Sequence, residues 1–206
     1  MWGQTIWPVT LECGDIILRP IRRRDKTAWT ELRSRNFEWL APWEASSPSP
    51  GGQLPTFGGM VRGLNEQARA ASALPFIIAE RAPGRPAPKL VGQLTVSSIV
   101  WGSAMMATLG YWVDKDHAGR GITPTAVAMA TDHCFLGLGL HRMEINIRPE
   151  NAPSLRVVEK LGFRDEGLRP RYLHINGRWA DHRSFALTSE EVPGGLLERW
   201  LANRSS

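Results

Sequence analysis

The stretch that most constrains the fold lies between Leu109 and Pro124 and reads LGYWVDKDHAGRGITP. Its first six residues, 109–114, predict a strand, because large apolar or aromatic side chains occupy alternate positions. Thr123 and Pro124 predict the start of a helix, with Thr123 as the N-cap and Pro124 in the first helical position. This order of strand, loop and helix predicts the first half of a β-α-β unit.

The loop between strand and helix encloses one basic residue, Arg120, between Gly119 and Gly121. Glycines leave room for backbone N–H groups to turn toward one point. The helix start adds unpaired N–H groups and the positive end of its dipole. We therefore expect an anion cradle that suits a diphosphate. The pattern is neither a P-loop nor a complete Rossmann fingerprint, and taken alone it also fits an ordinary turn.

The composition indicates one globular domain over residues 1–206, with 42% hydrophobic and 22% charged residues. A formal net charge of +5 favours polyanionic partners. Cys13 and Cys134 are far apart and lack metal-ligand spacing, which indicates a reduced cytoplasm and no metal site. No apolar run approaches the ~20 residues of a membrane span, and residues 1–4 lack the features of a signal peptide. We expect a cytoplasmic protein without a membrane partner.

Apolar periodicity and turn signals predict the other elements of the fold. We expect strands over 15–21, 75–80, 90–100 and 104–114, an order that suggests an antiparallel meander with a proline-rich hairpin connection at 82–89. We expect helices over 25–35 with Asp25 as N-cap, over 56–73, and from the glycine loop to about residue 136. The alternating segment 142–148 predicts the strand that completes a parallel, right-handed β-α-β unit.

The last quarter of the chain carries two further local signals. Residues from Asn151 to Phe163 predict a helix with Asn151 as N-cap, Pro153 in the first turn and Gly162 at its end. The sequence His-Ile-Asn-Gly-Arg at 174–178 predicts a two-residue hairpin turn, between a strand that starts near 163–165 and one that returns over 183–188. We expect a terminal helix around 196–201.

Three parts of the sequence together resemble one known family. They are the strand, glycine loop and helix from 109 onward, the pattern Asn-x-x-Ser…Lys-Leu-Gly-Phe at 151–163, and Trp-Leu-x-Pro-Trp at 39–43. The chain is similar to the GNAT N-acetyltransferases, and in particular to the RimJ/RimL type that acetylates the N-termini of ribosomal proteins. The resemblance implies an α/β (α+β) GNAT fold, in which a mixed, mostly antiparallel sheet is flanked by helices. A central β-α-β unit and a splayed strand pair would form an acetyl-CoA-binding core over 104–163.

The resemblance also implies which residues bind acetyl-CoA, the co-substrate. Backbone amides of the glycine loop would hold its pyrophosphate, although Asp116 stands where the family's loop begins with glutamine or arginine. An unpaired N–H near Val113 would polarise the thioester carbonyl. The set implied for acetyl-CoA binding is Trp112, Val113, His117, Ala118, Gly119, Arg120, Gly121, Ile122, Thr123, Asn151 and Ser154.

Transfer of acetyl to an amine requires a neutral amine, a polarised carbonyl and a proton for the departing thiolate. The resemblance places Ser154 at the CoA sulfur, with Asn151 beside it as a second candidate catalytic residue. Tyr172, in the C-terminal hairpin, is a further candidate acid. In the alternative interpretation, Asn151 and Ser154 only cap the start of a helix. No step requires a nucleophilic cysteine, so Cys134 is interpreted as a small core residue.

In the family that the chain resembles, the segment after the first helix helps to wall the acceptor groove. This assigns Trp39, Leu40, Trp43 and Glu44 to substrate binding, although the same segment would also serve as a hydrophobic lid. It opens a long connection over 42–59, where prolines and glycines prevent regular structure. The general base stays open between Glu44, Glu144, the pair Asp181-His182 and a chain of waters. An N-terminal α-amine, with a pKa near ~8, needs no strong base.

The expected acceptor is a protein N-terminus or peptide, from a ribosomal protein, bound by a monomer or homodimer. Two rival functions remain: acetylation of a small amine such as an antibiotic, polyamine or amino acid, and a CoA-binding module without catalysis. The triplet Arg22-Arg23-Arg24 fits either a solvated turn or a contact with phosphate or RNA, without a specific nucleic acid partner.

Overall fold

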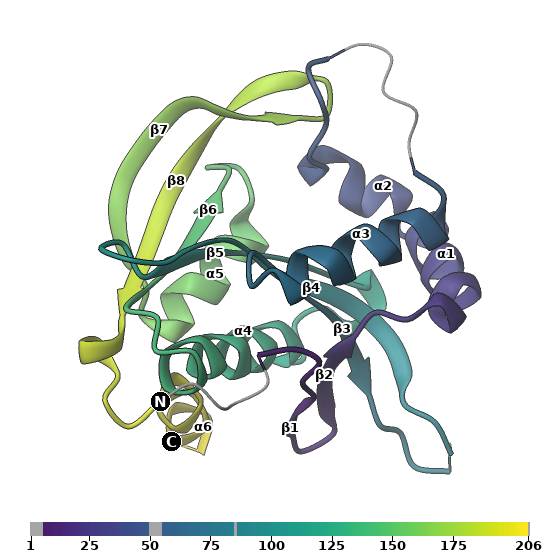
Figure 1. The fold of residues 1–206 in the computed structure, drawn as a ribbon, viewed down its shortest axis with the longest axis horizontal. Coiled ribbons are helices and arrows are strands. Elements are labelled where there is room, and N and C mark those ends of the chain that lie inside the picture. Colours follow the sequence, from purple (N-terminus) through teal and green to yellow (C-terminus); the bar gives the residue numbers. More distant parts are fainter. Residues whose placement is uncertain (1–5, 50–54, 85, 206) are drawn as a thin grey trace.

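The computed structural model describes residues 6–49, 55–84 and 86–205, and these residues form one eight-stranded sheet with helices on both faces (Figure 1). In spatial order the strands are β1 (Leu11–Cys13), β2 (Ile16–Pro20), β3 (Leu74–Glu80), β4 (Lys89–Val100), β5 (Met106–Val113), β6 (Arg142–Ile147), β8 (Arg178–Thr188) and β7 (Arg164–Ile175). The sheet is mixed and mostly antiparallel, as the sequence predicts.

β5 and β6 are the neighbouring strands of this sheet that run parallel, and they are also the strands that separate from one another. Neighbours from β1 to β5 are antiparallel, which confirms the predicted meander. β5 and β6 are parallel and pair only from Met106 opposite Arg142 to Thr108 opposite Glu144. Because β5 continues to Val113 without β6 beside it, the two strands separate beyond Thr108. The splayed pair is therefore present.

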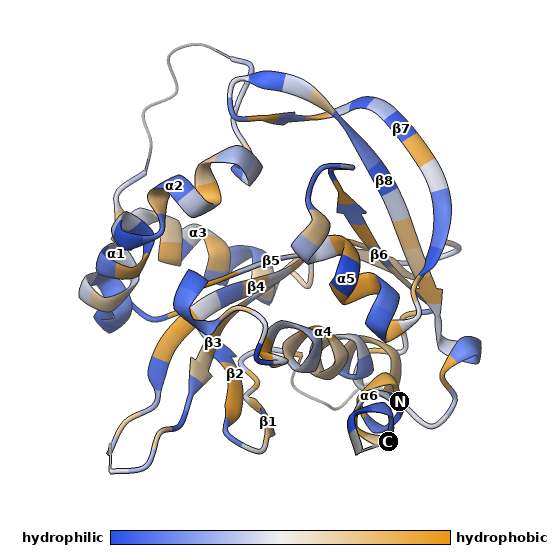
Figure 2. Cartoon of the chain, turned by 180° about the vertical axis from the view of Figure 1, so that it is seen from behind, coloured by the Kyte–Doolittle hydropathy of each residue, from blue (hydrophilic) through white to orange (hydrophobic). Residues whose placement is uncertain are grey.

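In the described part of the chain, α1, α2 and α3 lie on one face of the sheet and α4, α5 and α6 on the other. Adjacent residues of β3 show the division, since Ile77 packs with α1 (Lys26–Arg35) and α3 (Phe57–Arg69), whereas Ile78 packs with the cluster that includes α4 (Ile122–Asp132). The short helix α2 (Phe37–Leu40) follows α1. α5 (Ala152–Leu161) and α6 (Leu196–Ser205) lie on the same face as α4. Figure 2 shows both hydrophobic and hydrophilic residues along α5, consistent with one buried and one exposed side.

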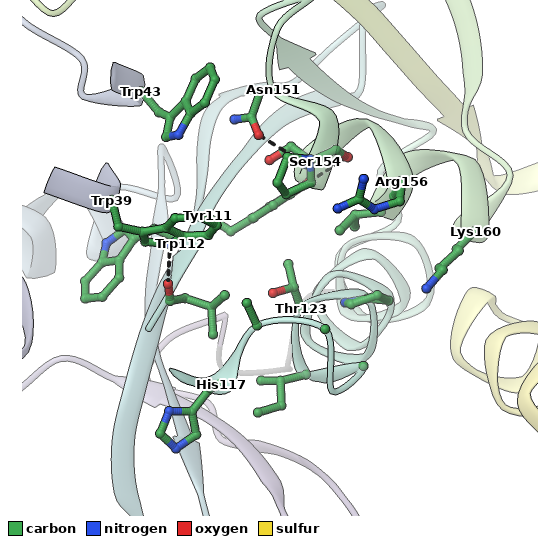
Figure 3. A pocket seen from close by; sticks show the side chains of 18 of the residues that line it. Trp39, Trp43, Tyr111, Trp112, His117, Thr123, Asn151, Ser154, Arg156 and Lys160 are labelled. Carbon is green, nitrogen blue, oxygen red and sulfur yellow. Dashed lines mark hydrogen bonds between the residues drawn. The ribbon is translucent and has the colours of Figure 1, made fainter. Parts of the chain in front are cut away.

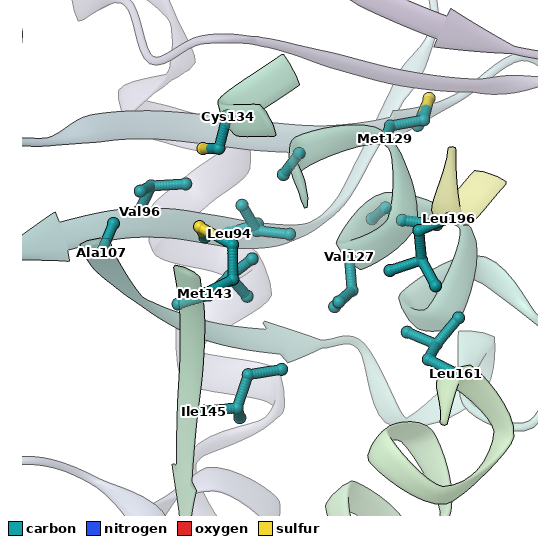
Figure 4. Packing of buried hydrophobic residues seen from close by; sticks show 14 of the residues in the cluster. Leu94, Val96, Ala107, Val127, Met129, Cys134, Met143, Ile145, Leu161 and Leu196 are labelled. Atoms are coloured by element: carbon teal, nitrogen blue, oxygen red, sulfur yellow. The ribbon is translucent and has the colours of Figure 1, made fainter. Parts of the chain in front are cut away.

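The central helix α4 is buried on all sides, because the sheet lies under it and α6 over it. Figure 4 shows this core, with Leu94, Val96 and Met143 from the strands facing Val127 and Cys134. No charged residue falls in its first ten positions, since no part of that surface meets water. The helix ends at Asp132 and continues as one π-helical turn, His133–Gly137, close to the predicted end.

Some predicted boundaries are wrong for local reasons. Thr123 is not the N-cap of α4: Gly121 takes that position with φ +81°, so the helix begins at Ile122 and Pro124 is its third residue. The helix predicted over 56–73 ends at Arg69. The three-residue strand β1 was not predicted. The predicted connection at 42–59 begins with the helical turn Ala41–Trp43; its residues 50–54, like Arg85 and residues 1–4, lie outside the described residues.

β7 and β8 form a long hairpin that reaches over the gap between β5 and β6; we call residues 164–188 the arm (Figure 1). Its turn is Asn176-Gly177, both with positive φ (45° and 81°), as the sequence predicts. Ser46 N–H donates to the His174 carbonyl at 2.9 Å, and Ala45 bridges Ile175. The segment after α2 is thus attached to the tip of the arm.

No helix among residues 6–49, 55–84 and 86–205 combines the length and apolar character required to cross a membrane.

Candidate active site

A pocket of about 250 Å³ lies where β5 and β6 separate (Figure 3). Its walls come from four segments: α2 and the turn after it, the end of β5, the glycine loop with the start of α4, and the first turns of α5. The lining residues are Trp39, Leu40, Trp43, Tyr111, Trp112, Val113, His117, Ala118, Gly119, Gly121, Ile122, Thr123, Pro124, Asn151, Pro153, Ser154, Arg156, Val157 and Lys160. The structure therefore brings together most residues that the sequence assigned to acetyl-CoA and acceptor binding.

The glycine loop has the shape of an anion cradle. Gly119 and Gly121 adopt φ +76° and +81°, in the left-handed region that favours glycine. A Cβ at Gly119 would meet no atom within 4 Å, so this part of the loop faces open space. The N–H groups at the start of α4 follow directly, and Arg156 and Lys160 of α5 also line the pocket. Backbone N–H groups, a helix start and two cations fit the phosphate groups of acetyl-CoA.

Asp114, the residue just before the glycine loop, connects this loop to the end of α1 and the residue that follows it. The Asp114 carboxylate accepts hydrogen bonds from Asn36 Nδ2 at 2.9 Å and from Arg35, and lies 2.8 Å from His117 Nδ1. Burial alone would raise the pKa of Asp114, but the Asn36 hydrogen bond, the Arg35 charge and the His117 contact together hold it below its usual value. Asn36 also accepts from the Lys115 N–H at 2.9 Å. These contacts fix the position from which the glycine loop departs.

The backbone of Val113 faces the gap between β5 and β6. Asp114 N–H donates to the Val91 carbonyl of β4 at 2.8 Å. Because the backbone N–H and C=O groups of successive strand residues point to opposite sides, those of Val113 point away from β4. The Val113 carbonyl confirms this direction, because it accepts a hydrogen bond from the Trp39 indole at 3.3 Å. The Val113 N–H is therefore directed into the gap, where the pocket lies.

Two candidate catalytic residues, Asn151 and Ser154, line the pocket at the start of α5. Asn151 is the N-cap as predicted, and its side-chain oxygen accepts from the Ser154 N–H at 3.2 Å (Figure 3). This hydrogen bond uses the backbone of Ser154 and leaves its hydroxyl unassigned. The helix-capping function is thus real, and it does not exclude a catalytic one.

Tyr111 is one candidate site residue that sequence reasoning missed. Its phenol oxygen lies 3.5 Å from the Ser154 carbonyl oxygen, so it stands beside the same turn of α5. Burial raises the pKa of Tyr111, which keeps the phenol protonated and able to donate. The alternation at 109–113 identified it only as a strand residue; its position at the point where β6 departs is not visible in the sequence. Arg156 and Lys160 were missed for the same reason.

Three predicted side chains lie outside the pocket lining. The Arg120 guanidinium binds Glu80 at 2.6 Å, so its side chain turns from the cradle to β3. Glu44 forms an ion pair with Arg33. Tyr172 is 37% exposed on the arm, beneath the guanidinium of Arg169. An ion pair or an exposed strand position determines where each of these three side chains lies, and their assignment to the site stays a prediction.

The candidate general bases also form other interactions. Glu144 pairs with Arg142 at 2.8 Å, Asp181 accepts from the Arg171 N–H at 2.7 Å, and the His182 ring lies 3.0 Å from the Ala180 carbonyl. None of them lines the pocket. Burial raises the pKa of Cys134 to about 12, so this thiol is not a nucleophile at neutral pH.

Comparisons with known proteins identify the family of the chain. An acetyltransferase (GNAT) domain model matches residues 15–164. The structure of Mycobacterium smegmatis RimJ in complex with CoA-disulfide has 38% identity and a TM-score of 0.85, covering 96% of this chain and 95% of that one. The [ribosomal protein uS5]-alanine N-acetyltransferase of Escherichia coli is 29% identical over 90% of this chain and 94% of its own. The probable N-acetyltransferase YjcK of Bacillus subtilis is 39% identical over 50% of this chain and 57% of its own. The chain belongs to the GNAT family of acetyl-CoA-dependent N-acetyltransferases.

Proposed function

We propose that this protein transfers acetyl from acetyl-CoA to the N-terminal α-amine of a protein, by direct attack in a ternary complex. The observation that carries the proposal is the single pocket that joins the glycine loop to Trp39 and Trp43. The relatives support the acceptor class, since the E. coli protein acts on ribosomal protein uS5 and the M. smegmatis protein is a RimJ. A ribosomal protein is the acceptor we propose.

The acceptor side of the pocket suits an extended chain. α2 and the turn after it form one wall, and the arm passes above, attached to the segment at Ala45 and Ser46. Trp43 contacts the Arg148 guanidinium, which lies 5.5 Å from the ring centroid, while Arg148 also donates to the Pro42 carbonyl at 2.8 Å. These contacts hold Trp43 as a fixed apolar surface. No carboxylate among the described residues lines the pocket, which disfavours a polycationic acceptor.

The residues at the gap supply what the chemistry needs. Acetyl-CoA contributes the acetyl group as a thioester, in which the C–S bond breaks as the new C–N bond forms. The Val113 N–H, directed into the gap, is placed to donate to the carbonyl oxygen as negative charge develops on it. The Tyr111 phenol or the Ser154 hydroxyl gives a proton to the thiolate, and the amine loses its proton to water. A pKa near ~8 leaves an α-amine partly neutral at pH 7, so no strong base is required.

A comparison of acceptors tests this proposal. The purified protein is incubated with labelled acetyl-CoA and either a peptide that begins with alanine or spermidine at equal concentration. We expect kcat/KM for the peptide to exceed that for spermidine by at least about tenfold, about 1.4 kcal/mol of transition-state binding. A preference for spermidine would identify a small-amine enzyme, and no transfer to either would indicate a module that binds CoA without catalysis.

A further inference from the structure

A second cleft, of about 330 Å³, lies between the turn that follows β2 and helix α3. None of its described lining residues also lines the active-site pocket. Four arginines line it: Arg22 and Arg23 from the turn, and Arg62 and Arg69 from α3. We call it the arginine cleft. No acidic residue appears among the described residues that line it.

The charges of the arginine cleft are poorly compensated within the described part of the chain. Arg23 and Arg69 form no ion pair there, and the contact of Arg62 with Glu66 is long (3.9 Å) and exposed. The nearby carboxylate of Asp25 is already used, because it accepts from Arg19 at 2.8 Å and from the Arg22 N–H at 2.8 Å. Four like charges in one concavity repel one another, and a bound anion would relieve that repulsion.

Other arginines of the protein behave differently. Arg142 and Arg164 both bind Glu166, and Arg183 binds Asp165. These three arginines are neutralised by carboxylates of the arm, in contrast to Arg23 and Arg69 at the cleft. What distinguishes the cleft is that four arginines line one concavity without a carboxylate among its described lining residues.

The backbone beneath the cleft is firmly held. Asn65, on the same side of α3 as Arg62 and Arg69, accepts from the Trp7 indole at 3.2 Å and donates to the Val61 carbonyl at 2.8 Å. The Asp25 carboxylate fixes the turn at Arg22 through that residue's N–H. Arg62 and Arg69 are two helical turns apart, about 10 Å along the axis, so together they can contact more than one phosphate of a chain.

The chemistry of the lining selects the ligand. Guanidinium groups bind phosphate oxygens in pairs of hydrogen bonds. Proteins that bind single-stranded RNA stack the bases on aromatic side chains, and none of the described residues that line this cleft is aromatic. Duplex RNA is instead contacted at its backbone, largely without regard to sequence. We infer that the arginine cleft binds the phosphate backbone of double-stranded RNA.

This inference goes beyond the proposed function, because acetyl transfer does not require the cleft. The choice of RNA over DNA as the duplex rests on the proposed function, since a ribosomal protein is presented next to RNA. Docking through the cleft would hold the enzyme near its substrate while the active-site pocket, lined by other residues, remains open.

Fluorescence anisotropy with a labelled RNA duplex of about 16 base pairs tests the inference directly. The cleft variant is Arg62→Gln/Arg69→Gln. The matched control is Arg171→Gln/Arg178→Gln, which removes two exposed arginines of the arm. We expect the cleft variant to bind at least tenfold more weakly and the control to stay within twofold of the parent. The slope of log affinity against log salt should become shallower by about 1 for each arginine that contacts a phosphate.

Circular dichroism and the melting temperature show whether both variants are folded; the substituted side chains are exposed, so both should match the parent. Equal losses in the two variants, or no loss in either, would overturn the inference. Tighter binding of a DNA duplex of the same sequence than of the RNA duplex would also overturn it. So would a cleft variant that no longer binds inorganic pyrophosphate but binds the RNA duplex as well as the parent does. Because no acetyl transfer is measured, these outcomes are independent of the acceptor assay.

Discussion

At the scale of single residues, Gly119 and Gly84 provide a matched pair for testing the anion cradle. Their φ angles are +76° and +74°, and a Cβ at either meets no other atom within 4 Å. Gly119→Asp should weaken CoA binding at least tenfold, about 1.4 kcal/mol, because it places a carboxylate beside the phosphates. Gly84→Asp carries the same backbone strain and charge in the β3–β4 connection. Calorimetry should show unchanged affinity for it; equal losses in both would remove the loop from the site.

Two residues beside the start of α5 could donate the proton to the CoA thiolate. Tyr111 and Ser154 both reach the turn that begins α5. If Tyr111 is the donor, Tyr111→Phe should lower kcat by roughly 10²-fold with little change in CoA affinity, whereas Ser154→Ala should change it less. The reverse order would assign the role to Ser154. Full kcat in both single variants and in the double variant would contradict a protein donor at this position.

At the scale of elements, Asp132 connects two helices. Its carboxylate, at the end of α4, accepts from the N–H groups of Leu196 and Leu197 at 2.6 and 2.9 Å and so caps the start of α6. Asp132→Ala should reduce the free energy of unfolding by about 1 kcal/mol. For a protein of this size that lowers Tm by about 2–4 °C, measurable by calorimetry. Asp116→Ala is the control, since Asp116 is exposed; an equal shift for both would argue against the cap.

The segment after α2 gives a prediction for acceptor binding. Trp43 lines the pocket and is held by Arg148. Trp43→Ala should raise the KM for the peptide at least tenfold, about 1.4 kcal/mol, and leave the KM for acetyl-CoA unchanged. Trp101→Ala, at the distant β4–β5 turn, should change neither. If Trp43→Ala raises the KM for acetyl-CoA alone, this wall serves the co-substrate and not the acceptor.

Local signals predicted some elements well and others poorly. Asn151 and the Asn176-Gly177 turn were predictable because their backbone needs are met by their own side chains or by glycine. Thr123 failed as an N-cap because Gly121, in a left-handed conformation, begins the helix earlier. The strand β1 has three residues and depends on pairing with β2, which no local pattern reveals.

The site itself was predictable in its backbone and less so in its side chains. The glycine loop follows from sequence, whereas Arg120 turns to Glu80, a residue 40 positions away that no spacing rule connects to it. Tyr111 and Lys160 enter the pocket only because β6 departs from β5 and α5 packs against α4. Side chains whose role depends on such tertiary placement require the structure.

At the scale of the whole molecule, the sheet separates the residues proposed to bind acetyl-CoA from those proposed to bind the acceptor, and the two sets meet where β5 and β6 separate. The face with α4 and α5 carries the anion cradle, and the face with α1, α2 and α3 carries the acceptor wall and the arginine cleft. The pocket passes between them where β5 and β6 separate (Figure 3). Under the proposed function, this arrangement would let acetyl-CoA and a peptide approach one another from opposite sides of the sheet.

The central claim, that the acceptor is an N-terminal α-amine, is tested most directly by locating the acetyl group on one peptide that offers both kinds of amine. The peptide begins with a free alanine and contains one internal lysine, and tandem mass spectrometry after incubation with acetyl-CoA identifies the modified nitrogen. Because the α-amine has a pKa near ~8 and the lysine near ~10.4, a site without a strong base should acetylate the first. We predict acetyl on the alanine nitrogen and none on the lysine; acetyl found mainly on the lysine would contradict the proposed function.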